Sequence, residues 1–527
     1  MAGFDFIKDL PTFFMFLFVL QRLKPADWGY LPHFGDVNRR DITPLEAEKL
    51  ATEAAEKVRD ETGREVPKDF IETRAKEIIK QDSIRTIDLS DMVITGKAAG
   101  ATATFKGKKD DAIPTRFGLN GRSTGVKRGE LSISVDEDGK KKPDQAVALK
   151  LSWAEINRTR EKAIVDRARK AFEGKKFREG GDPSDYLPEI LGEKVFAEFD
   201  TDIVRLAVLQ NYEAERAKRP LAKRCPVLVL MPKYEPISFI TSLSEATRVS
   251  LFIALIYCHA MLWSIGIEHG DISEGNLMYE ESTYRPKLCD YDLAHIRGRD
   301  RPSGHSNTGT WAFMASDLLT LDAMDGKVRR LYRHDFESFI AVLVWVFLRY
   351  DKEKRIPNSL VDCWVQDDFD RCLTNRGRTY NLIEHGKITR PEWLTKVMWL
   401  ELKSLVITFN NILTARRTAE RELSGLETRR TRAGVDTSGL STGGSKNGGA
   451  FFAPREDNTT TLWSKEDEEM LASLKRDIEE YDDLRFAKMA FSTIPLFRLG
   501  TSLGPYFDKE MKEHLKVTED QATNVPT

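Results

Sequence analysis

Four polar side chains in the middle of the chain have the types and spacing that phosphoryl transfer requires. His269 and Asp271 form an H-x-D element, Asn276 follows Asp271 by five residues, and Asp290 ends an apolar stretch further on. In this chemistry one carboxylate takes or orients the proton of the acceptor hydroxyl, while another carboxylate and an amide oxygen hold Mg²⁺ against the phosphates. Asp271 fits the first role, and Asn276 and Asp290 fit the second. An ordinary loop capped by Asp and Asn would contain the same residue types.

A lysine nearer the N-terminus lies in a sequence typical of a phosphate-binding residue. Lys150 ends the sequence VALK, which is close to the strand signature V-A-I-K. An ammonium group at the end of a buried strand costs free energy unless it is paired, and a phosphate with a helix carboxylate would pair it. Glu161 is our candidate for that carboxylate, and Glu155 is its competitor. Taken alone, such a lysine also fits the protein surface.

A glycine-containing stretch precedes this lysine. Residues 118–126 include Gly121, Gly125 and Val126, and their backbone N–H groups could approach phosphates. The stretch does not match G-x-G-x-x-G, and an ordinary turn fits it equally well.

The elements around these residues change type along the chain. Strand patterns occupy residues 115–151, a charged helix pattern runs over 154–172, and another apolar strand covers 225–231. Apolar helix patterns follow at 245–263 and 335–349. Strands followed mostly by helices predict an α+β protein with a small sheet lobe and a larger helical lobe.

The flanks have a different composition. Residues 43–81 predict two charged helices, and residues 416–462 have the Gly-, Ser-, Thr- and Arg-rich composition of a flexible linker. The apolar run 13–20 is too short to span a bilayer and lacks a basic stretch before it, so we predict a buried segment and no membrane span.

Composition narrows the class of protein. A hydrophobic content of 41% over 527 residues supports a sizeable core and excludes a wholly disordered chain. The net charge of −2 predicts no nucleic-acid partner. Five widely spaced cysteines predict free thiols and a location in the cytoplasm or nucleus.

Four segments together resemble the fungal-type protein kinase family, a divergent branch of the eukaryotic protein kinase fold. They read HGDISEGN, LCDYDLA, TGTWAFMASDLL and RHDFESFIAVLVWV. The resemblance covers roughly residues 110–415. It implies a two-lobed kinase-like fold, with an N-terminal segment and helical extension over 1–110, a β-rich N-lobe over 111–232, and a helical C-lobe over 233–415. The 416–462 linker and a C-terminal helical extension over 463–527 would follow.

The resemblance also implies the cofactors ATP and Mg²⁺ and a protein substrate. Asp271, Lys150 and Glu161 would be the catalytic residues, with Asp271 as base, and Asn276 and Asp290 would bind the metal. Adenine would be contacted near residues 230–234. The implied nucleotide-binding residues are Gly121, Gly125, Val126, Ala148, Lys150, Met231, Asn276 and Asp290. Residues 308–317 would face the protein substrate, and Asp335 would brace the catalytic loop.

The sequence departs from the general kinase pattern at several positions. Gly270 replaces an arginine that pairs with phosphorylated activation loops, and Ser273 replaces a lysine that stabilises the transferring phosphoryl group. Asp292 replaces the glycine of D-F-G, and it is either an extra metal ligand or, as we favour, a helix cap. Ser316 and Asp317 replace the Pro and Glu of A-P-E.

The sequence therefore supports three functional hypotheses. The first is a protein Ser/Thr kinase, because suitable side chains fill the positions for nucleotide and metal chemistry. The second is an inactive kinase fold that works as a binding scaffold, which the missing lysine and the long extensions motivate. The third is a small-molecule phosphotransferase of the aminoglycoside or choline kinase type, because HGD text resembles that group.

Overall fold

The computed structural model describes most of the chain between residues 86 and 482. The described ranges are 86–107, 124–175, 182–197, 200–202, 223–298, 309–366, 368–432 and 463–482, with the single residues Ala51, Thr52, Ala55, Ile71 and Phe486. The predicted apolar segment 13–20, nearly all of the predicted helices at 43–81, and Gly121 lie outside the described residues.

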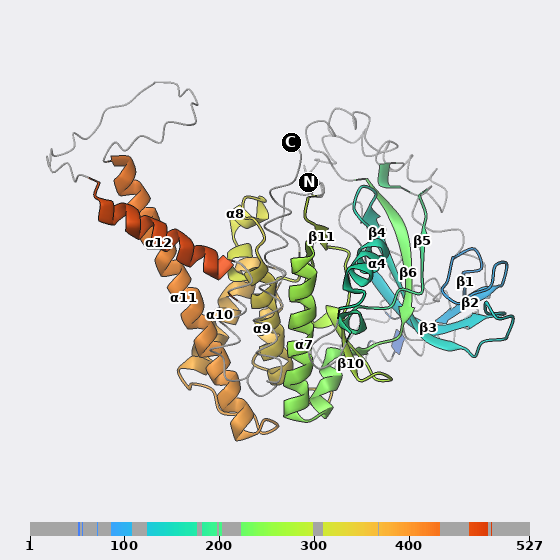
Figure 1. Ribbon diagram of the computed structural model, residues 1–527. Coiled ribbons are helices and arrows are strands. Elements are labelled where there is room, and N and C mark those ends of the chain that lie inside the picture. Colours follow the sequence, from blue (N-terminus) through green and yellow to red (C-terminus); the bar gives the residue numbers. More distant parts are fainter. Residues whose placement is uncertain are drawn as a thin grey trace, which may run out of the picture. The chain divides into compact units, whose positions relative to one another are not determined.

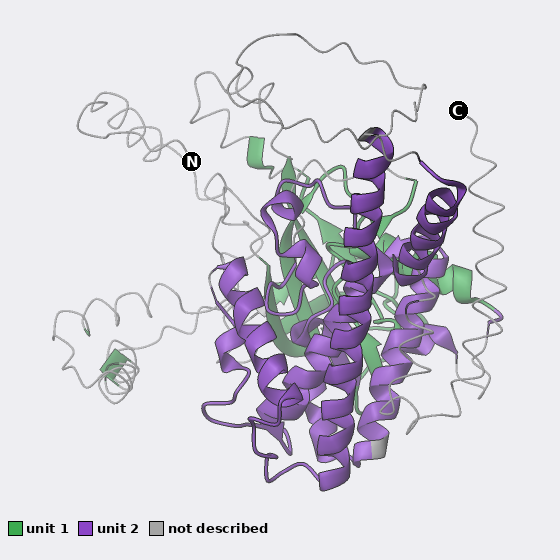
Figure 2. Ribbon diagram, turned by 90° about the vertical axis from the view of Figure 1, so that its left-hand side faces the viewer, with its two compact units in different colours: residues 1–173, 187–235, 280–304 green, residues 174–186, 236–279, 305–527 purple. Residues whose placement is uncertain are grey.

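The chain divides into two compact units, which Figure 2 shows in different colours. Unit 1 comprises residues 1–173, 187–235 and 280–304, and unit 2 comprises residues 174–186, 236–279 and 305–527. Both strands and helices are present, so the predicted α+β class is confirmed.

Unit 1 is built on a six-stranded antiparallel sheet with the strand order β1-β2-β3-β4-β6-β5 (Figure 1). The strands are β1 (Thr86–Asp88), β2 (Ala103–Gly107), β3 (Gly125–Ile133), β4 (Gln145–Glu155), β5 (Gly192–Val195) and β6 (Arg224–Pro232). Every second residue of β3 is buried, which is the period of a strand with one face on the core. Phe105, Leu131, Leu149 and Leu230 belong to that core.

The first two strands were not predicted. Residues 86–88 and 103–107 fall within the expected N-terminal extension, yet they pair with the sheet. Such short strands show too little alternation to be recognised alone; β2 is stabilised by pairing with β3, and β1 by pairing with β2. Gly129 of β3 accommodates this pairing, because a Cβ atom there would lie 2.4 Å from the carbonyl oxygen of Lys106.

Helix α4 (Glu161–Phe172) follows β4 in unit 1 and begins later than the sequence predicts. Strand β4 continues to Glu155, and residues 156–160 form the connection to α4. Ile156 N in this connection donates a hydrogen bond to Lys223 O, which lies just before β6. Short strands β10 (Arg285–Leu288) and β11 (His295–Ile296) complete unit 1, and β7 (Glu235–Pro236) lies at the boundary between the units.

Unit 2 is mainly helical. Its α-helices are α7 (Glu245–Ser264), α8 (Leu321–Met324), α9 (Tyr332–Arg349), α10 (Phe369–Glu384), α11 (Lys396–Arg432) and α12 (Lys465–Asp482). Its short 3-10 helices are η2 (Pro183–Tyr186), η3 (Ile237–Ser242), η4 (Glu274–Asn276), η5 (Ser316–Leu318) and η6 (Asp362–Trp364). Its short strands are β8 (Ile267–Glu268), β9 (Leu277–Glu280), β12 (Tyr350–Asp351) and β13 (Lys354–Arg355), with the last residue of β9 at the boundary.

Two apolar helices form the interior of unit 2. Residues 332–348 of α9 are all buried, which a helix apolar on all sides requires. Helix α7 begins at the N-cap Ser244, whose Oγ accepts a hydrogen bond from Thr247 N. Residues 247–264 of α7 are long and apolar enough to cross a membrane, but 72% of that window is buried within the protein. This burial matches the core helix of a folded unit.

Helices α11 and α12 lie side by side (Figures 1 and 2). Leu426 of α11 packs with Leu471 and Leu474 of α12 in a small apolar cluster. Helix α11 therefore continues through residues 416–432, which the sequence assigned to a linker. Gly425 costs a helix interior about 1 kcal/mol, and the packing of α12 offsets that cost. Most of the remaining predicted linker, 433–462, lies outside the described residues.

Candidate active site

The buried ammonium group of Lys150 is the centre of a charged cluster in unit 1. Lys150 Nζ lies 2.7 Å from Glu161 Oε2, 2.8 Å from Asp290 Oδ1 and 2.9 Å from Asp292 Oδ2. The Lys150 side chain is 3% exposed. The competitor Glu155 instead pairs with Arg224 at 2.9 Å. A lysine in this position is held by carboxylates from two separate parts of the chain.

Strand pairing and the start of α4 put these groups together. Lys150 faces Val229 of β6 and Val126 of β3 in the strand register. Glu161 is the first residue of α4, where a carboxylate interacts favourably with the helix dipole. Its Oε1 accepts a hydrogen bond of 3.0 Å from Tyr291 N, which ties the helix to the backbone between the two aspartates.

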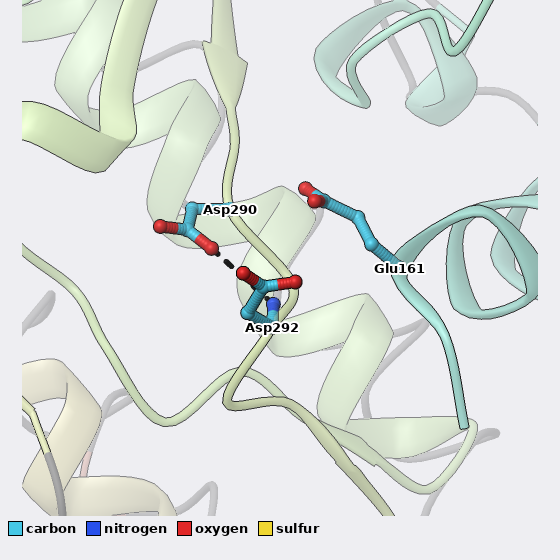
Figure 3. Close-up of side chains that lie close together, drawn as sticks. All are labelled: Glu161, Asp290 and Asp292. Atoms are coloured by element: carbon cyan, nitrogen blue, oxygen red, sulfur yellow. Dashed lines mark hydrogen bonds between the residues drawn. The ribbon is translucent and has the colours of Figure 1, made fainter. Parts of the chain in front are cut away.

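The three carboxylates converge, as Figure 3 shows. One oxygen from each of Glu161, Asp290 and Asp292 lies within 4.8 Å of the others. Asp292 N donates to Asp290 Oδ1 at 3.3 Å. Asp290 has a φ of 65°, in the left-handed region that Asp tolerates better than most residues. The two acidic side chains on either side of Tyr291 therefore point toward one another (Figure 3).

Asp292 is not a helix cap, which corrects our preferred interpretation of this residue. The described residues 291–298 form a turn and the short strand β11, with no helix beginning there. Arg158 donates to the carbonyl oxygen of Asp292, and the Asp292 side chain is 9% exposed. Among the described residues Asp292 Oδ2 accepts no hydrogen bond, although it lies near Lys150 Nζ.

The pKa values of the cluster reflect its excess negative charge. Burial alone would lower the pKa of Lys150, but Asp290, Glu161 and Asp292 raise it well above its ordinary value. Burial raises the pKa of Glu161 to about 7, with Lys150 opposing that rise and the two aspartates adding to it. One ammonium group cannot neutralise three carboxylates, so the cluster favours a further cation.

Unit 2 carries the H-x-D loop. Asp271 Oδ1 accepts hydrogen bonds from Thr310 N at 3.0 Å and Thr310 Oγ1 at 3.1 Å. Asn276 Nδ2 donates to the carbonyl oxygen of Asp271 at 2.8 Å, and His269 Nδ1 accepts from Asp271 N at 3.3 Å. Because the amide nitrogen of Asn276 holds the loop, its amide oxygen is the atom that can bind a cation.

Asp335 of α9 holds the same loop from the core. Its Oδ2 accepts from Gly270 N at 3.1 Å and lies 2.9 Å from His259 Nε2, while Oδ1 accepts from Arg330 Nε at 3.1 Å. Burial would raise the pKa of Asp335, but Arg330 and His259 lower it well below its usual value. Gly270 has a φ of 83°, a conformation that favours glycine, which accounts for the residue found where kinases commonly have arginine.

The predicted nucleotide contacts of unit 1 lie on paired strands. Gly125 and Val126 begin β3, and the Val126 side chain is 53% exposed. Ala148 of β4 and Met231 of β6 are register partners. Gly121 is outside the described residues.

Sequence reasoning missed two contacts that the structure shows. The hydrogen bonds between Thr310 and Asp271 cross 39 positions of the chain, and the contact between Asp292 and Lys150 joins segments that lie much further apart in the sequence. In the sequence, the TGT motif at 308–310 was the signal for the first contact, and Asp292 in place of the glycine of D-F-G was the signal for the second.

Residues 194–347 match a family model described as fungal protein kinase. The matched range includes Asp271, Asn276 and Asp290, whereas Lys150 and Glu161 precede it. No curated protein matches the chain. The family match confirms the resemblance inferred from the sequence motifs.

Proposed function

From the premise that residues 194–347 match the family model of fungal protein kinases, we propose that the chain transfers the γ-phosphoryl group of ATP to serine and threonine hydroxyls of protein substrates. The family supports a protein kinase and therefore a transferase. Dependence on ATP and Mg²⁺, the choice of hydroxyl and a two-lobed kinase arrangement are the finer parts of the proposal.

The buried Lys150 cluster is the observation that carries the proposal. Burying a lysine that is 3% exposed within 2.9 Å of three carboxylates costs desolvation free energy, so such a cluster adds little to stability. Phosphoryl transfer uses such an ammonium group to hold the α- and β-phosphates, with a helix carboxylate keeping it in place. Lys150 and Glu161 would have these two roles.

The donor set of the cluster fits a divalent cation. Carboxylate oxygens are the ligands that Mg²⁺ prefers, and Asp290 with Asp292 supplies them beside an ammonium group that cannot balance their charge. Asp290 and Asn276 would hold the ion, and Asp292 offers a further carboxylate. When bound, Mg²⁺ would neutralise charge on the phosphate oxygens.

The hydroxyl specificity is argued from Asp271. This carboxylate already accepts a hydrogen bond from the Thr310 hydroxyl at 3.1 Å, so it is oriented to accept from O–H groups. In the proposed reaction Asp271 takes the proton that the acceptor hydroxyl loses as its oxygen bonds to the γ-phosphorus, while the bond from that phosphorus to the β-phosphate oxygen breaks and ADP leaves. Ser273, which is 4% exposed, supplies no positive charge to the transferring group.

The test is transfer of labelled γ-phosphate from ATP with Mg²⁺ by the purified full-length protein, with a fungal extract as the source of substrates. Asp271→Asn keeps the shape of the side chain and removes the base. We expect label in protein with the unmodified chain and at least a 100-fold smaller initial rate with the variant. Asp477→Asn, on the exposed side of α12, is the matched control and should retain the full rate.

Nucleotide binding is measured separately, as the shift in thermal unfolding on adding ATP and Mg²⁺. Asp271→Asn should keep that shift. Label in the small-molecule fraction would replace the proposal with a metabolite phosphotransferase. Nucleotide binding without any transfer would replace it with a binding scaffold, and equal labelling by both proteins would show that Asp271 is not the base.

A further inference from the structure

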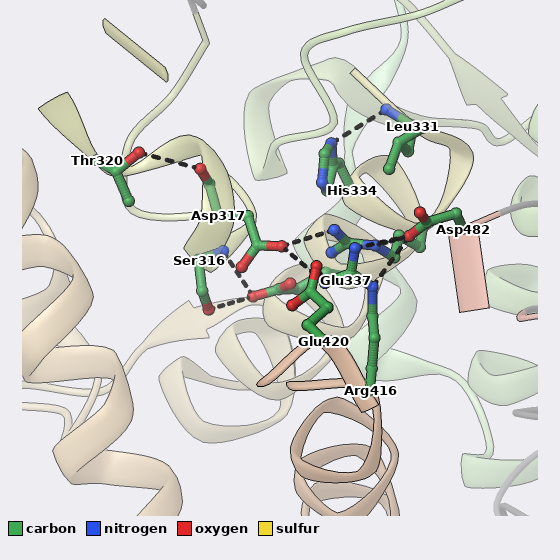
Figure 4. Close-up of polar contacts among 10 residues, drawn as sticks. Ser316, Asp317, Thr320, Leu331, His334, Glu337, Arg416, Glu420 and Asp482 are labelled. Carbon is green, nitrogen blue, oxygen red and sulfur yellow. Dashed lines mark hydrogen bonds and ion pairs between the residues drawn. The ribbon is translucent and has the colours of Figure 1, made fainter. Parts of the chain in front are cut away.

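Two buried arginines in unit 2 join four helical elements. Arg333 of α9 is 3% exposed and Arg416 of α11 is 6% exposed. Both contact Asp317 Oδ2 of η5, Arg333 at 2.6 Å and Arg416 at 3.5 Å. Both also contact Asp482 Oδ1 at the end of α12, each through its Nε at 2.9 Å (Figure 4). The two guanidinium groups and two carboxylates balance in charge.

Asp317 ends the segment 310–317, whose first residue contacts the proposed base Asp271. Thr310 N donates a hydrogen bond to Asp271, and six residues later Ser316 donates to Glu337 Oε1 through its N at 2.9 Å and its Oγ at 2.6 Å. Arg376 donates to the carbonyl oxygen of Ala312 at 3.2 Å. Residues 310–317 are therefore held at both ends by side chains of unit 2.

The C-terminal part of the chain is anchored at the same place. Asp482 is the last residue of α12, and Phe486 lies just beyond it with 0% exposure. The ring of Phe486 meets Phe336 of α9 edge-on at 5.5 Å between centroids. The ion pairs and the ring contact both fall within the first turns of α9, which also carries Asp335 and Glu337.

Removing Asp482 would change how Asp317 is held. Arg333 would keep only the Asp317 carboxylate among the ion-pair partners seen here, and Arg416 would keep Asp317 and Glu420. A buried guanidinium group is costly when its carboxylate is lost, so the two arginines would reorient. Arg333 and Arg416 are the charged groups that hold Asp317, so their reorientation would leave residues 310–317 less firmly positioned.

We propose that Asp482 is a positioning residue, through which the C-terminal helix α12 holds the segment 310–317 in the arrangement that binds the protein substrate. The inference rests on the proposed kinase function. Asp482 acts through Arg333 and Arg416 and touches neither nucleotide nor substrate. It gives the C-terminal extension a role in binding the protein substrate, separate from ATP binding.

The test compares Asp482→Asn with Asp477→Asn in the full-length protein. Both remove one carboxylate charge from α12, but Asp477 is on the exposed side. We expect Asp482→Asn to raise the KM for the protein substrate about tenfold and to leave the KM for ATP within twofold of the unmodified protein. Asp482→Glu, which keeps the charge, should restore most of the binding.

Amide hydrogen exchange provides a readout that does not depend on activity. In Asp482→Asn the amides of Thr310 and Ser316 should exchange at least about fivefold faster, with the core of α9 unchanged. Phe486→Ala, which leaves all four charged groups in place, should accelerate the same amides to a smaller extent. Should Asp482→Asn fail to fold, this second variant decides the question.

Three results would overturn the inference. These are unchanged exchange in residues 310–317, exchange that accelerates equally throughout unit 2, or an equal rise in both KM values. A chain that transfers no phosphate but shows the local acceleration would refute the proposed kinase function and retain the coupling. A chain that transfers phosphate without the local acceleration would retain the function and refute the coupling.

Discussion

Replacing Lys150 with methionine tests whether the carboxylates of the cluster depend on this one cation. Methionine nearly preserves the length of the side chain and removes the ammonium group. Glu161, Asp290 and Asp292, with oxygens within 4.8 Å of one another, would then lose the ammonium group of Lys150 from between them. We expect a loss of stability that depends on pH, because carboxyl groups can relieve the repulsion by taking up protons.

The magnitude follows from the geometry and burial. Each contact at about 2.8 Å is worth about 6 kcal/mol of gross attraction at an effective dielectric constant of about 20, most of which offsets desolvation. Breaking a fully buried pair costs about 3–5 kcal/mol. Asp290 is 27% exposed, and Glu161, whose pKa is already raised to about 7, protonates readily. We therefore expect a loss of about 3 kcal/mol at pH 7.5.

The sign of the pH dependence is set by the folded-state pKa values. Without Lys150 the pKa of Glu161, which burial already raises, moves further above its unfolded value, because the ammonium group that opposed the rise is gone. An acid with a raised folded-state pKa costs no stability below its unfolded pKa, and its cost grows as pH rises to the folded pKa. The loss in Lys150→Met should therefore shrink to about 1 kcal/mol at pH 5.

Urea unfolding of the full-length protein without nucleotide, followed by tryptophan fluorescence, measures both values. Lys162→Met is the matched control, because Lys162 lies on α4 with a partly exposed ion pair to Asp166 and should lose less than about 0.5 kcal/mol. An equal loss for Lys150→Met at the two pH values would refute the electrostatic reasoning. A loss as small as that of Lys162→Met would show that the cluster does not depend on this cation.

Two further substitutions test the loop of unit 2. Asp335→Asn should lower stability by about 2–3 kcal/mol in urea unfolding at pH 7, because the charged group that accepts hydrogen bonds from Gly270 N and Arg330 is lost. Since the folded-state pKa of Asp335 is lowered, this difference in stability holds above the unfolded pKa near 3.8 and declines as pH falls below it. A difference that grew toward pH 3 would contradict the assignment. Thr310→Val removes the hydroxyl that is hydrogen-bonded to Asp271 and should lower kcat for a protein substrate about tenfold, with little change in the KM for ATP. Thr283→Val, at an exposed position, is its control. Equal kcat values for the two variants would refute a role for the Thr310 hydroxyl.

The residue types of the candidate site could be recognised from the sequence because their chemistry demands particular side chains at particular spacings. Asp271, Asn276 and Asp290 stand in short motifs, and Lys150 follows a strand pattern. The α+β class followed from the change between strand and helix periods. The central strand β6 and the apolar helices α7 and α9 were predicted within a few residues of their observed bounds, because buried elements have long, regular apolar patterns.

Elements with weak local patterns could not be predicted in this way. The short strands β1 and β2 depend on pairing with the sheet, and residues 416–432 of α11 are helical despite their linker-like composition. In both cases tertiary contacts supply the stabilisation that local propensity lacks.

The sequence by itself determined which residues could perform phosphoryl transfer and which family the chain resembles, because these depend on short stretches of chain. The tertiary structure decided between Glu161 and Glu155 as the partner of Lys150, made Asp292 part of the charged cluster, and brought Asp482 to the arginines that hold Asp317. Each of these contacts joins charged groups whose pairing depends on distance in space. Many acidic and basic residues in the sequence are chemically equivalent, so only the fold selects which of them meet.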